Sequence, residues 1–101
     1  MVLISPVAIA QTDTLYIHTS AQCGTCKKKI ERDMTFAKGV KKVQLDLESR
    51  ILKVIYQSSK TTPAMLREAV TNIGYDADSL LAKPDAYERL PACCKKGGHG
   101  H

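Results

Sequence analysis

Hydrophobic and polar residues alternate along three short stretches of the chain. In each stretch the hydrophobic residues fall on every second position, which predicts a strand with one buried face. They are Leu15 and Ile17 in the first stretch, Val43, Leu45 and Leu47 in the second, and Leu52, Val54 and Tyr56 in the third. Residues 48–50 form a short polar break between the second and third stretches, which predicts a hairpin.

Two further segments carry hydrophobic residues at helical spacing. The first contains Ile30, Met34 and Ala37, and we expect Gly39 to end it. The second begins after Thr62-Pro63, a capping residue followed by a proline suited to the first helical turn. The hydrophobic stripe of this second helix comprises Leu66, Ala69, Val70 and Ile73, and Gly74 follows it.

The order of these elements predicts a fold class. If residues 75–81 supply a short last strand, the order is β-α-β-β-α-β within about 70 residues. This order is typical of an α+β ferredoxin-like sandwich, in which two helices cover one face of a four-stranded antiparallel sheet. We therefore expect one domain at residues 11–82, followed at residues 83–101 by a tail that contains Cys and His and shows no clear period.

Residues 1–10 differ in character from the rest of the chain. They are apolar and uncharged and end in Ala8-Ile9-Ala10, which resembles the small-residue cleavage site of a signal peptide. We interpret them as the remnant of a signal peptide. The mature protein is then expected in the periplasm or another extracytoplasmic compartment, with the cytoplasm as the alternative.

Length and charge narrow the classes of function. A chain of 101 residues suits one small domain, and no apolar run reaches the roughly 20 residues of a membrane span. The net charge of +5 is concentrated in residues 27–42, which carry seven positive and two negative side chains. Because the aromatic motifs of RNA-binding domains are missing, this charge favours a partner with an acidic surface over nucleic acid.

The segment Cys23-Gly24-Thr25-Cys26 lies between the first predicted strand and the first predicted helix. A C-x-x-C spacing brings two sulfurs to one point, and the helix N-terminus stabilises their thiolate forms, as do the neighbouring lysines at 27–29. A thiolate either binds a metal or attacks a disulfide. The spacing by itself favours neither of these, and a purely structural disulfide is a third possibility.

The surrounding residues resemble those of the heavy-metal-associated (HMA) domain family, to which copper chaperones and periplasmic mercury carriers belong. The features that carry the resemblance are C-x-x-C, Ile30-Glu31, Met34, Gly39-Val40, the hairpin, the apolar second helix and Gly74-Tyr75. The resemblance implies a metal carrier rather than an enzyme, with Cys23 and Cys26 as ligands and Tyr75 beside the metal loop. Ala21 departs from the family, which usually has Met there, and we expect the loop to be less anchored as a result.

The alternative function is a thioredoxin-like thiol–disulfide oxidoreductase. The sequence from Cys23 to Lys27 is similar to a thioredoxin active site, and Thr62-Pro63 is similar to the threonine–proline pair near such sites. Against this, no Trp precedes Cys23, and only a hairpin separates the first helix from Thr62. Pro63 also opens a helix, where a thioredoxin continues into a strand.

Two thiolates without a third ligand suit a soft ion of low coordination number. Cu(I) fits best and Hg(II) is close behind, whereas Zn(II) prefers four ligands. Such an open site can pass its ion to the thiolates of a partner, such as a metal-transporting ATPase or another C-x-x-C protein with an acidic docking face. A protein that sequesters metal for resistance remains an alternative to delivery.

The tail carries further candidate ligands. Cys93 and Cys94 are adjacent, and either could add a sulfur to the Cys23–Cys26 pair if the tail folds back. His99 and His101 could capture a metal weakly. We expect these four residues to be auxiliary to the first pair.

Overall fold

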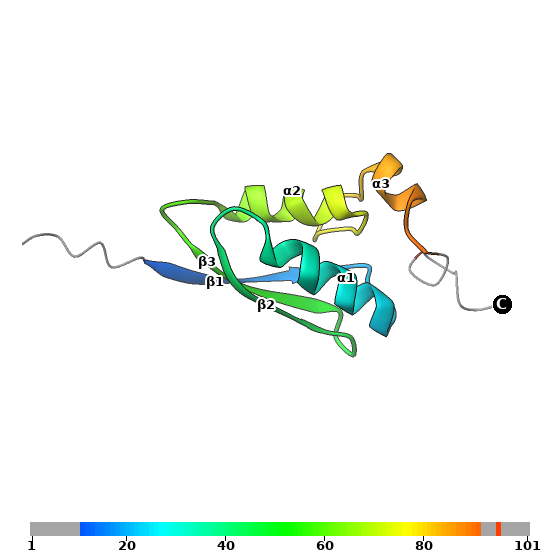
Figure 1. The fold of residues 1–101 in the computed structure, drawn as a ribbon, viewed down its shortest axis with the longest axis horizontal. Coiled ribbons are helices and arrows are strands. Elements are labelled where there is room, and N and C mark those ends of the chain that lie inside the picture. Colours follow the sequence, from blue (N-terminus) through cyan, green and yellow to red (C-terminus); the bar gives the residue numbers. More distant parts are fainter. Residues whose placement is uncertain (1–10, 92–94, 96–101) are drawn as a thin grey trace, which may run out of the picture.

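The computed structural model describes residues 11–91 and residue 95. Its strands are β1 (Thr12–His18), β2 (Val40–Asp46) and β3 (Ile51–Gln57), and its helices are α1 (Gly24–Thr35), α2 (Pro63–Ile73) and α3 (Pro84–Glu88). The strands form one antiparallel sheet in the order β1-β3-β2. Helices α1 and α2 lie on the same face of this sheet (Figure 1). The α+β class and the predicted order of the first five elements are confirmed.

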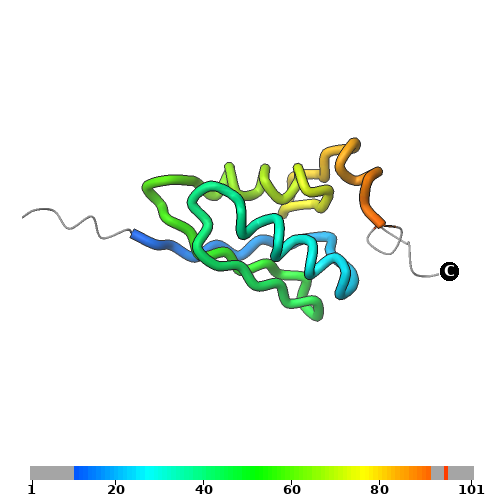
Figure 2. Tube along the Cα trace, in the orientation of Figure 1, coloured from blue at the N-terminus to red at the C-terminus, as the bar shows by residue number. Residues whose placement is uncertain are grey.

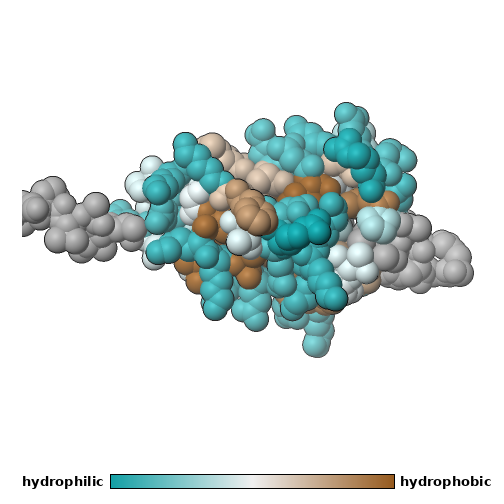
Figure 3. Space-filling model, in the orientation of Figure 1, coloured by the Kyte–Doolittle hydropathy of each residue, from teal (hydrophilic) through white to brown (hydrophobic). Residues whose placement is uncertain are grey.

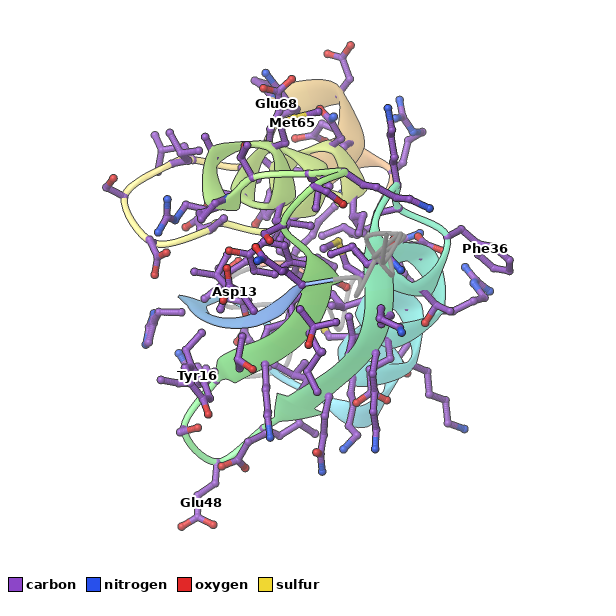
Figure 4. The ribbon with its side chains drawn as sticks, turned by 90° about the vertical axis from the view of Figure 1, so that its left-hand side faces the viewer. Asp13, Tyr16, Phe36, Glu48, Met65 and Glu68 are labelled. Atoms are coloured by element: carbon purple, nitrogen blue, oxygen red, sulfur yellow. The ribbon has the colours of Figure 1, made fainter. Side chains whose placement is uncertain are left out.

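The alternation of the strands separates a buried face from an open one. Ile17, Leu52 and Leu45 are paired across β1, β3 and β2, and all three are fully buried beneath the helices. The preceding residue of β1, Tyr16, is paired with Lys53 and lies 60% exposed on the opposite face. Figure 4 shows its ring pointing away from the helices. The sheet therefore buries one face only.

Both predicted helices are present. In α1 the fully buried residues are Cys26, Ile30 and Met34, spaced four residues apart along one face. The helix ends at Thr35, earlier than Gly39, which instead adopts φ +80° in the turn that leads into β2. In α2 the side chain of Thr62 accepts a hydrogen bond from the Met65 N–H at 3.2 Å, as a capping residue should.

The prediction of a fourth strand at residues 75–81 is wrong. Within the described residues, two isolated β-bridges form there, one between Ala77 and Thr19 and one between Ala77 and Leu80. Asp78 adopts a left-handed conformation (φ +53°), and the amide of Leu80 donates to the carbonyl of Ala77. The chain therefore turns back on itself after one bridge and does not extend along β1.

Helix α3 lies in the segment that we interpreted as a tail without a period. Ala86 and Leu90 are buried, and the helix packs against α2. The amide of Lys83 donates to the carbonyl of Thr71 at 3.0 Å, which fixes the start of α3 to the end of α2. Figure 2 shows that α3 and the beginning of α1 lie at the same end of the molecule.

The outer surface is largely hydrophilic on the face shown in Figure 3, with hydrophobic side chains visible between the helices. Among the exceptions are Phe36 at the end of α1 and Met65 on α2, which project outward (Figure 4). Within residues 11–91, no helix has the length and apolar character needed to cross a membrane.

The close packing of α3 over Gly74 generates a stability prediction. Gly74 has φ +121°, and a Cβ placed there would lie 2.9 Å from the carbonyl oxygen of Ala86. We expect Gly74→Ala to lower the free energy of unfolding by about 1–3 kcal/mol, because both the backbone conformation and the contact become strained. Urea denaturation followed by circular dichroism measures this change.

Gly24 supplies the matched control, because a Cβ there would meet nothing within 4 Å. We expect Gly24→Ala to stay within about 0.5 kcal/mol of the original protein. Equal stability of the two variants would show that α3 does not pack against Gly74.

Candidate metal centre

The loop that leads from β1 to the cysteines is held by hydrogen bonds from distant parts of the chain. The amide of Thr19 donates to the carbonyl of Arg50 at 2.8 Å, in the hairpin turn. The Ser20 hydroxyl accepts from the amide of Asp76 at 2.9 Å, after α2. The Thr19 hydroxyl accepts from the amide of Ala21 at 3.2 Å. The sequence analysis did not identify these hydrogen bonds.

The two cysteines occupy different positions at the start of α1. Cys23 is the N-cap residue, with an extended backbone, and its side chain is half-buried. Cys26 lies in the first helical turn and is fully buried. No disulfide joins them, since their sulfur atoms lie 3.3 Å apart. The pair is thus a dithiol whose sulfurs already face each other.

This separation limits how a metal enters. With a metal–sulfur distance of about 2.3 Å, as in zinc–thiolate sites, two sulfurs on opposite sides of an ion are about 4.6 Å apart. One sulfur must therefore move outward by a little over 1 Å. Because Cys26 is packed into the core, we expect the movement to come from Cys23.

Ala21 and Tyr75, the two residues expected to support the site, are both fully buried. They belong to the same cluster of buried side chains as Cys26, and Cys23 packs against this cluster. Both residues are therefore part of the buried core into which Cys26 is packed. Their role beside the metal stays a prediction.

The lysines that follow Cys26 are partly neutralised. Lys27 lies 3.7 Å from the Glu31 carboxylate, and Lys29 lies 3.5 Å from that of Asp33, both one helical turn away. Lys28 is exposed and forms no ion pair with any residue in the described part of the chain. The positive field beside the cysteines is therefore weaker than the count of lysines suggests.

Lys27 and Glu31 also bind the backbone of an edge strand of the sheet. The Glu31 carboxylate accepts a hydrogen bond from the amide of Leu45 at 2.8 Å, and the Lys27 ammonium donates to the carbonyl of the same residue at 3.0 Å. Leu45 lies on β2, which is an edge strand. Both of its backbone groups are thus bound by side chains of α1, which fixes the helix that carries Cys26 to the sheet.

A third ligand is not present among residues 11–91 and 95, where no group of three or more Cys, His, Asp or Glu gathers. The predicted auxiliary ligands Cys93, Cys94, His99 and His101 lie outside the described residues. Lys95 is described, and its carbonyl accepts a hydrogen bond from the side chain of Gln22 at 2.9 Å. Sequence reasoning did not single out Gln22.

Asp78 stabilises the turn that replaces the fourth strand. Its carboxylate accepts hydrogen bonds from the amide of His18 at 2.9 Å and from the Arg67 side chain at 2.8 Å. Partial burial acts to raise the pKa of Asp78. The two hydrogen bonds and the positive charges of Arg67 and His18 outweigh burial and lower this pKa below its ordinary value of 3.8.

Comparison with known proteins agrees with this geometry. Residues 20–76 match the heavy-metal-associated domain family. The chain belongs to this family. The cysteines Cys23 and Cys26 fit its C-x-x-C motif, and the domain of this family is a metal-binding, non-enzymatic one.

Three relatives illustrate the likeness. The periplasmic component of a mercuric transport protein from Shewanella putrefaciens is 31% identical over 72 residues, which cover 71% of this chain and 78% of that protein. Copper-transporting ATPase 1 of Rattus norvegicus is 34% identical over 62 residues, 61% of this chain but only 4% of the ATPase. The solved structure of a CopZ metallochaperone has a TM-score of 0.61 and 26% identity, and the match covers 64% of this chain and 98% of CopZ.

The difference in burial between the two cysteines generates a prediction about reactivity. In the reduced, metal-free protein, we expect iodoacetamide to modify Cys23 well before Cys26, because only Cys23 reaches the surface. Mass spectrometry of proteolytic peptides resolves the rate at each cysteine. In urea, where the packing is lost, the two rates should converge; equal rates in the folded protein would contradict the burial of Cys26.

The lowered pKa of Asp78 generates a prediction about acid stability. A carboxylate whose pKa falls on folding stabilises the protein above its ordinary value, and this stabilisation disappears as the pH falls through the folded value. We therefore expect Asp78→Asn to be less stable than the original protein at neutral pH. The difference should shrink as the pH drops below 3.8, the ordinary value.

Urea titrations at several pH values measure this difference. Asp13→Asn is a suitable control because Asp13 is exposed on β1 (Figure 4), and we expect its effect at neutral pH to stay within about 0.5 kcal/mol. A difference for Asp78→Asn that stays constant down to strongly acidic pH would contradict the proposed role of the carboxylate.

Proposed function

We propose that this protein is a small metal carrier that binds Cu(I) through the thiolates of Cys23 and Cys26. The observation that carries the proposal is the position of the two sulfurs, 3.3 Å apart at the start of α1, one fully buried and one half-buried. The pair can bind a soft ion through two sulfurs. Its exposed side remains open to an incoming ligand.

The coordination number favours Cu(I). Two thiolates alone satisfy a soft ion of low coordination number, whereas Zn(II) prefers four ligands. Hg(II) shares the preference for two sulfurs and is the second candidate. Relatives named as a copper-transporting ATPase and as a mercuric transport protein support both of these ions.

Transfer to a partner is the proposed role of the open side. The partner is a metal-transporting ATPase or another C-x-x-C protein, whose thiolates add to the ion before Cys23 releases it. Exposed positive side chains on α1 and β2 favour an acidic docking face on that partner. They include Lys28, Lys41 and Lys42. Sequestration of the ion for resistance is the alternative to transfer.

The proposed compartment is the periplasm or another extracytoplasmic space. The Ala8-Ile9-Ala10 pattern supports export, as does the relative named as a periplasmic component. The cytoplasm remains the alternative. Residues 1–10 lie outside the described part of the chain, so this proposal depends on their sequence.

The oxidoreductase alternative has less support. A β-hairpin, and not a strand–helix–strand unit, lies between α1 and α2. Pro63 is the first residue of α2, so Thr62-Pro63 serves as a helix start. If the metal-free protein reduced insulin disulfides at thioredoxin-like rates, the carrier proposal would be wrong.

Replacement of the two cysteines tests the proposed function. We expect Cys23→Ser with Cys26→Ser to abolish tight Cu(I) binding, because a serine hydroxyl is a poor ligand for a soft ion. Competition with a chromophoric Cu(I) chelator, under argon and with reduced protein, measures the affinity. Parallel titrations with Hg(II) and Zn(II) establish the order of preference.

The control for this test is a measurement of whether the double variant still folds. Because Cys26 is buried, the circular dichroism spectrum and urea midpoint of the double variant must be recorded as well. Cys23→Ser alone keeps the buried cysteine and should still lose most of the affinity. Undiminished Cu(I) affinity in a folded double variant would refute the proposal.

A further inference from the structure

Strand β1 forms an edge of the sheet, because the chain after α2 turns away after one bridge. Figure 4 shows β1 at the left margin of the sheet, with β2 and α1 on the far side. The hydrogen bonds at the end of β1 show which way its backbone groups point. The amide of Thr19 donates to the carbonyl of Arg50, in the hairpin that leads into β3. Both backbone groups of His18 instead bind Asp78, on the side away from β3.

The outer side of β1 carries a row of unpaired backbone groups. Because the direction of these groups alternates along an antiparallel strand, those of Thr12, Thr14 and Tyr16 point away from β3, as those of His18 do. In the part of the chain that the structure describes, the amides and carbonyls of Thr12, Thr14 and Tyr16 have no hydrogen-bond partner on this side. Asp78 covers the edge at His18 alone.

The other edge of the sheet is protected, and β1 is not. On β2, Lys41 and Lys42 are exposed, and both backbone groups of Leu45 are bound by side chains of α1. Lysines, prolines and covering side chains are the usual devices that keep an edge strand from pairing with another chain. Strand β1 contains no Lys, Arg or Pro, and its one formal charge is Asp13. This edge is therefore suited to accept a further strand.

The distribution of charge favours a second copy of the chain as the source of that strand. Residues 27–42 carry the excess positive charge and lie on α1, on β2 and in the turn between them. Strand β3 separates β2 from β1. Two copies that meet through β1 keep these positive segments at the two outer sides of the joined sheet, so the repulsion between them is small.

We propose that two copies of this protein pair through β1 in antiparallel orientation, with Thr14 opposite Thr14 of the second copy. This register places Thr12 of each copy opposite Tyr16 of the other. All three outward residues then form hydrogen-bonded pairs, with two hydrogen bonds in each pair. His18 keeps its bonds to Asp78. A register centred on Leu15 would place Thr12 opposite His18, whose backbone groups are already used.

The side chains are compatible with this register. On the open face of the sheet, Thr14 meets its own copy and Thr12 meets the aromatic ring of Tyr16, and both kinds of pair stabilise antiparallel strands. On the helix face, Asp13 lies opposite Leu15. No two like charges are therefore directly opposite each other along the paired strands.

The pairing leaves the metal centre accessible. The loop that carries Cys23 follows the end of β1, and antiparallel strands place their ends on opposite sides of the dimer. The two metal loops thus point away from each other. The dimer needs no metal, and the proposal does not depend on the proposed function.

The test uses the full chain, reduced and free of metal. Three residue pairs make a smaller contact than a standard interface, so sedimentation velocity should cover about 10 μM to about 1 mM. We expect the fraction of dimer to rise over this range. Hydrogen exchange followed by NMR should show the amides of Thr12, Thr14 and Tyr16 exchanging more slowly as the dimer forms.

Substitution of Thr14 tests the register. Thr14→Lys and Thr14→Glu each place two like charges opposite each other, and we expect each to raise the dimer dissociation constant by about fivefold or more. An equimolar mixture of the two variants should restore the dimer, because Lys then faces Glu. Gln44→Glu is the matched control, since Gln44 is exposed on β2, the opposite edge strand, and we expect it to leave the dissociation constant unchanged. Circular dichroism checks that each variant is folded.

Four results would overturn the proposal. The first is an original protein that stays monomeric up to about 1 mM. The second is a dimer that persists in both Thr14 variants. The third is slow exchange of the Thr12, Thr14 and Tyr16 amides in the monomer, which would mean that the same chain covers the edge. The fourth is loss of the dimer in Cys23→Ser with Cys26→Ser, which would assign the contact to the metal loop.

Discussion

The burial of Cys26 is the constraint on which the metal centre depends. This residue shares one face of α1 with Ile30 and Met34, and all three are fully buried. The second sulfur of the pair is therefore placed by the same packing that holds α1 on the sheet. Because tightly packed interiors resist displacement, this sulfur is a fixed reference point, and Cys23 is the member of the pair that can adjust.

The attachment of α1 to the sheet extends this constraint to the edge of the fold. Glu31 and Lys27 bind the amide and the carbonyl of Leu45, so an edge strand that would otherwise expose these groups is covered by the helix. The same two residues form an ion pair with each other. The sequence suggests that the positive charge of Lys27 is available to a partner. In the structure, this charge is used in part to hold α1 on the sheet.

After α2 the chain leaves the sheet and returns to the loop that carries Cys23. Asp78 binds the backbone of His18 and ends the pairing after a single bridge, so the chain turns toward α3. Helix α3 lies at the same end of the molecule as the start of α1 (Figure 1), and Lys95 contacts Gln22 beside Cys23. A fourth strand would have carried residues 75–81 along β1 instead.

The sequence by itself determined the elements whose signals are local. Alternation at Leu15, Ile17 and their counterparts predicted the three strands, and the Thr62-Pro63 start and Gly74 end predicted α2. The C-x-x-C pair at a helix start depends only on residues 23–26 and their neighbours. Their spacing named the candidate ligands, and the wider resemblance that extends to Gly74-Tyr75 named the family.

The tertiary structure alone decided the features that depend on distant partners. Residues 75–81 are as suited to a strand as to a turn, and the turn forms because the carboxylate and amide of Asp78 meet the backbone of His18, 60 residues earlier. Helix α3 has only five residues, too short for a periodic signal, and exists because Ala86 and Leu90 find a buried surface on the rest of the fold. The contact of Gln22 with Lys95 likewise has no local signal, since hydrogen bonds between segments far apart in the chain follow from packing and not from spacing.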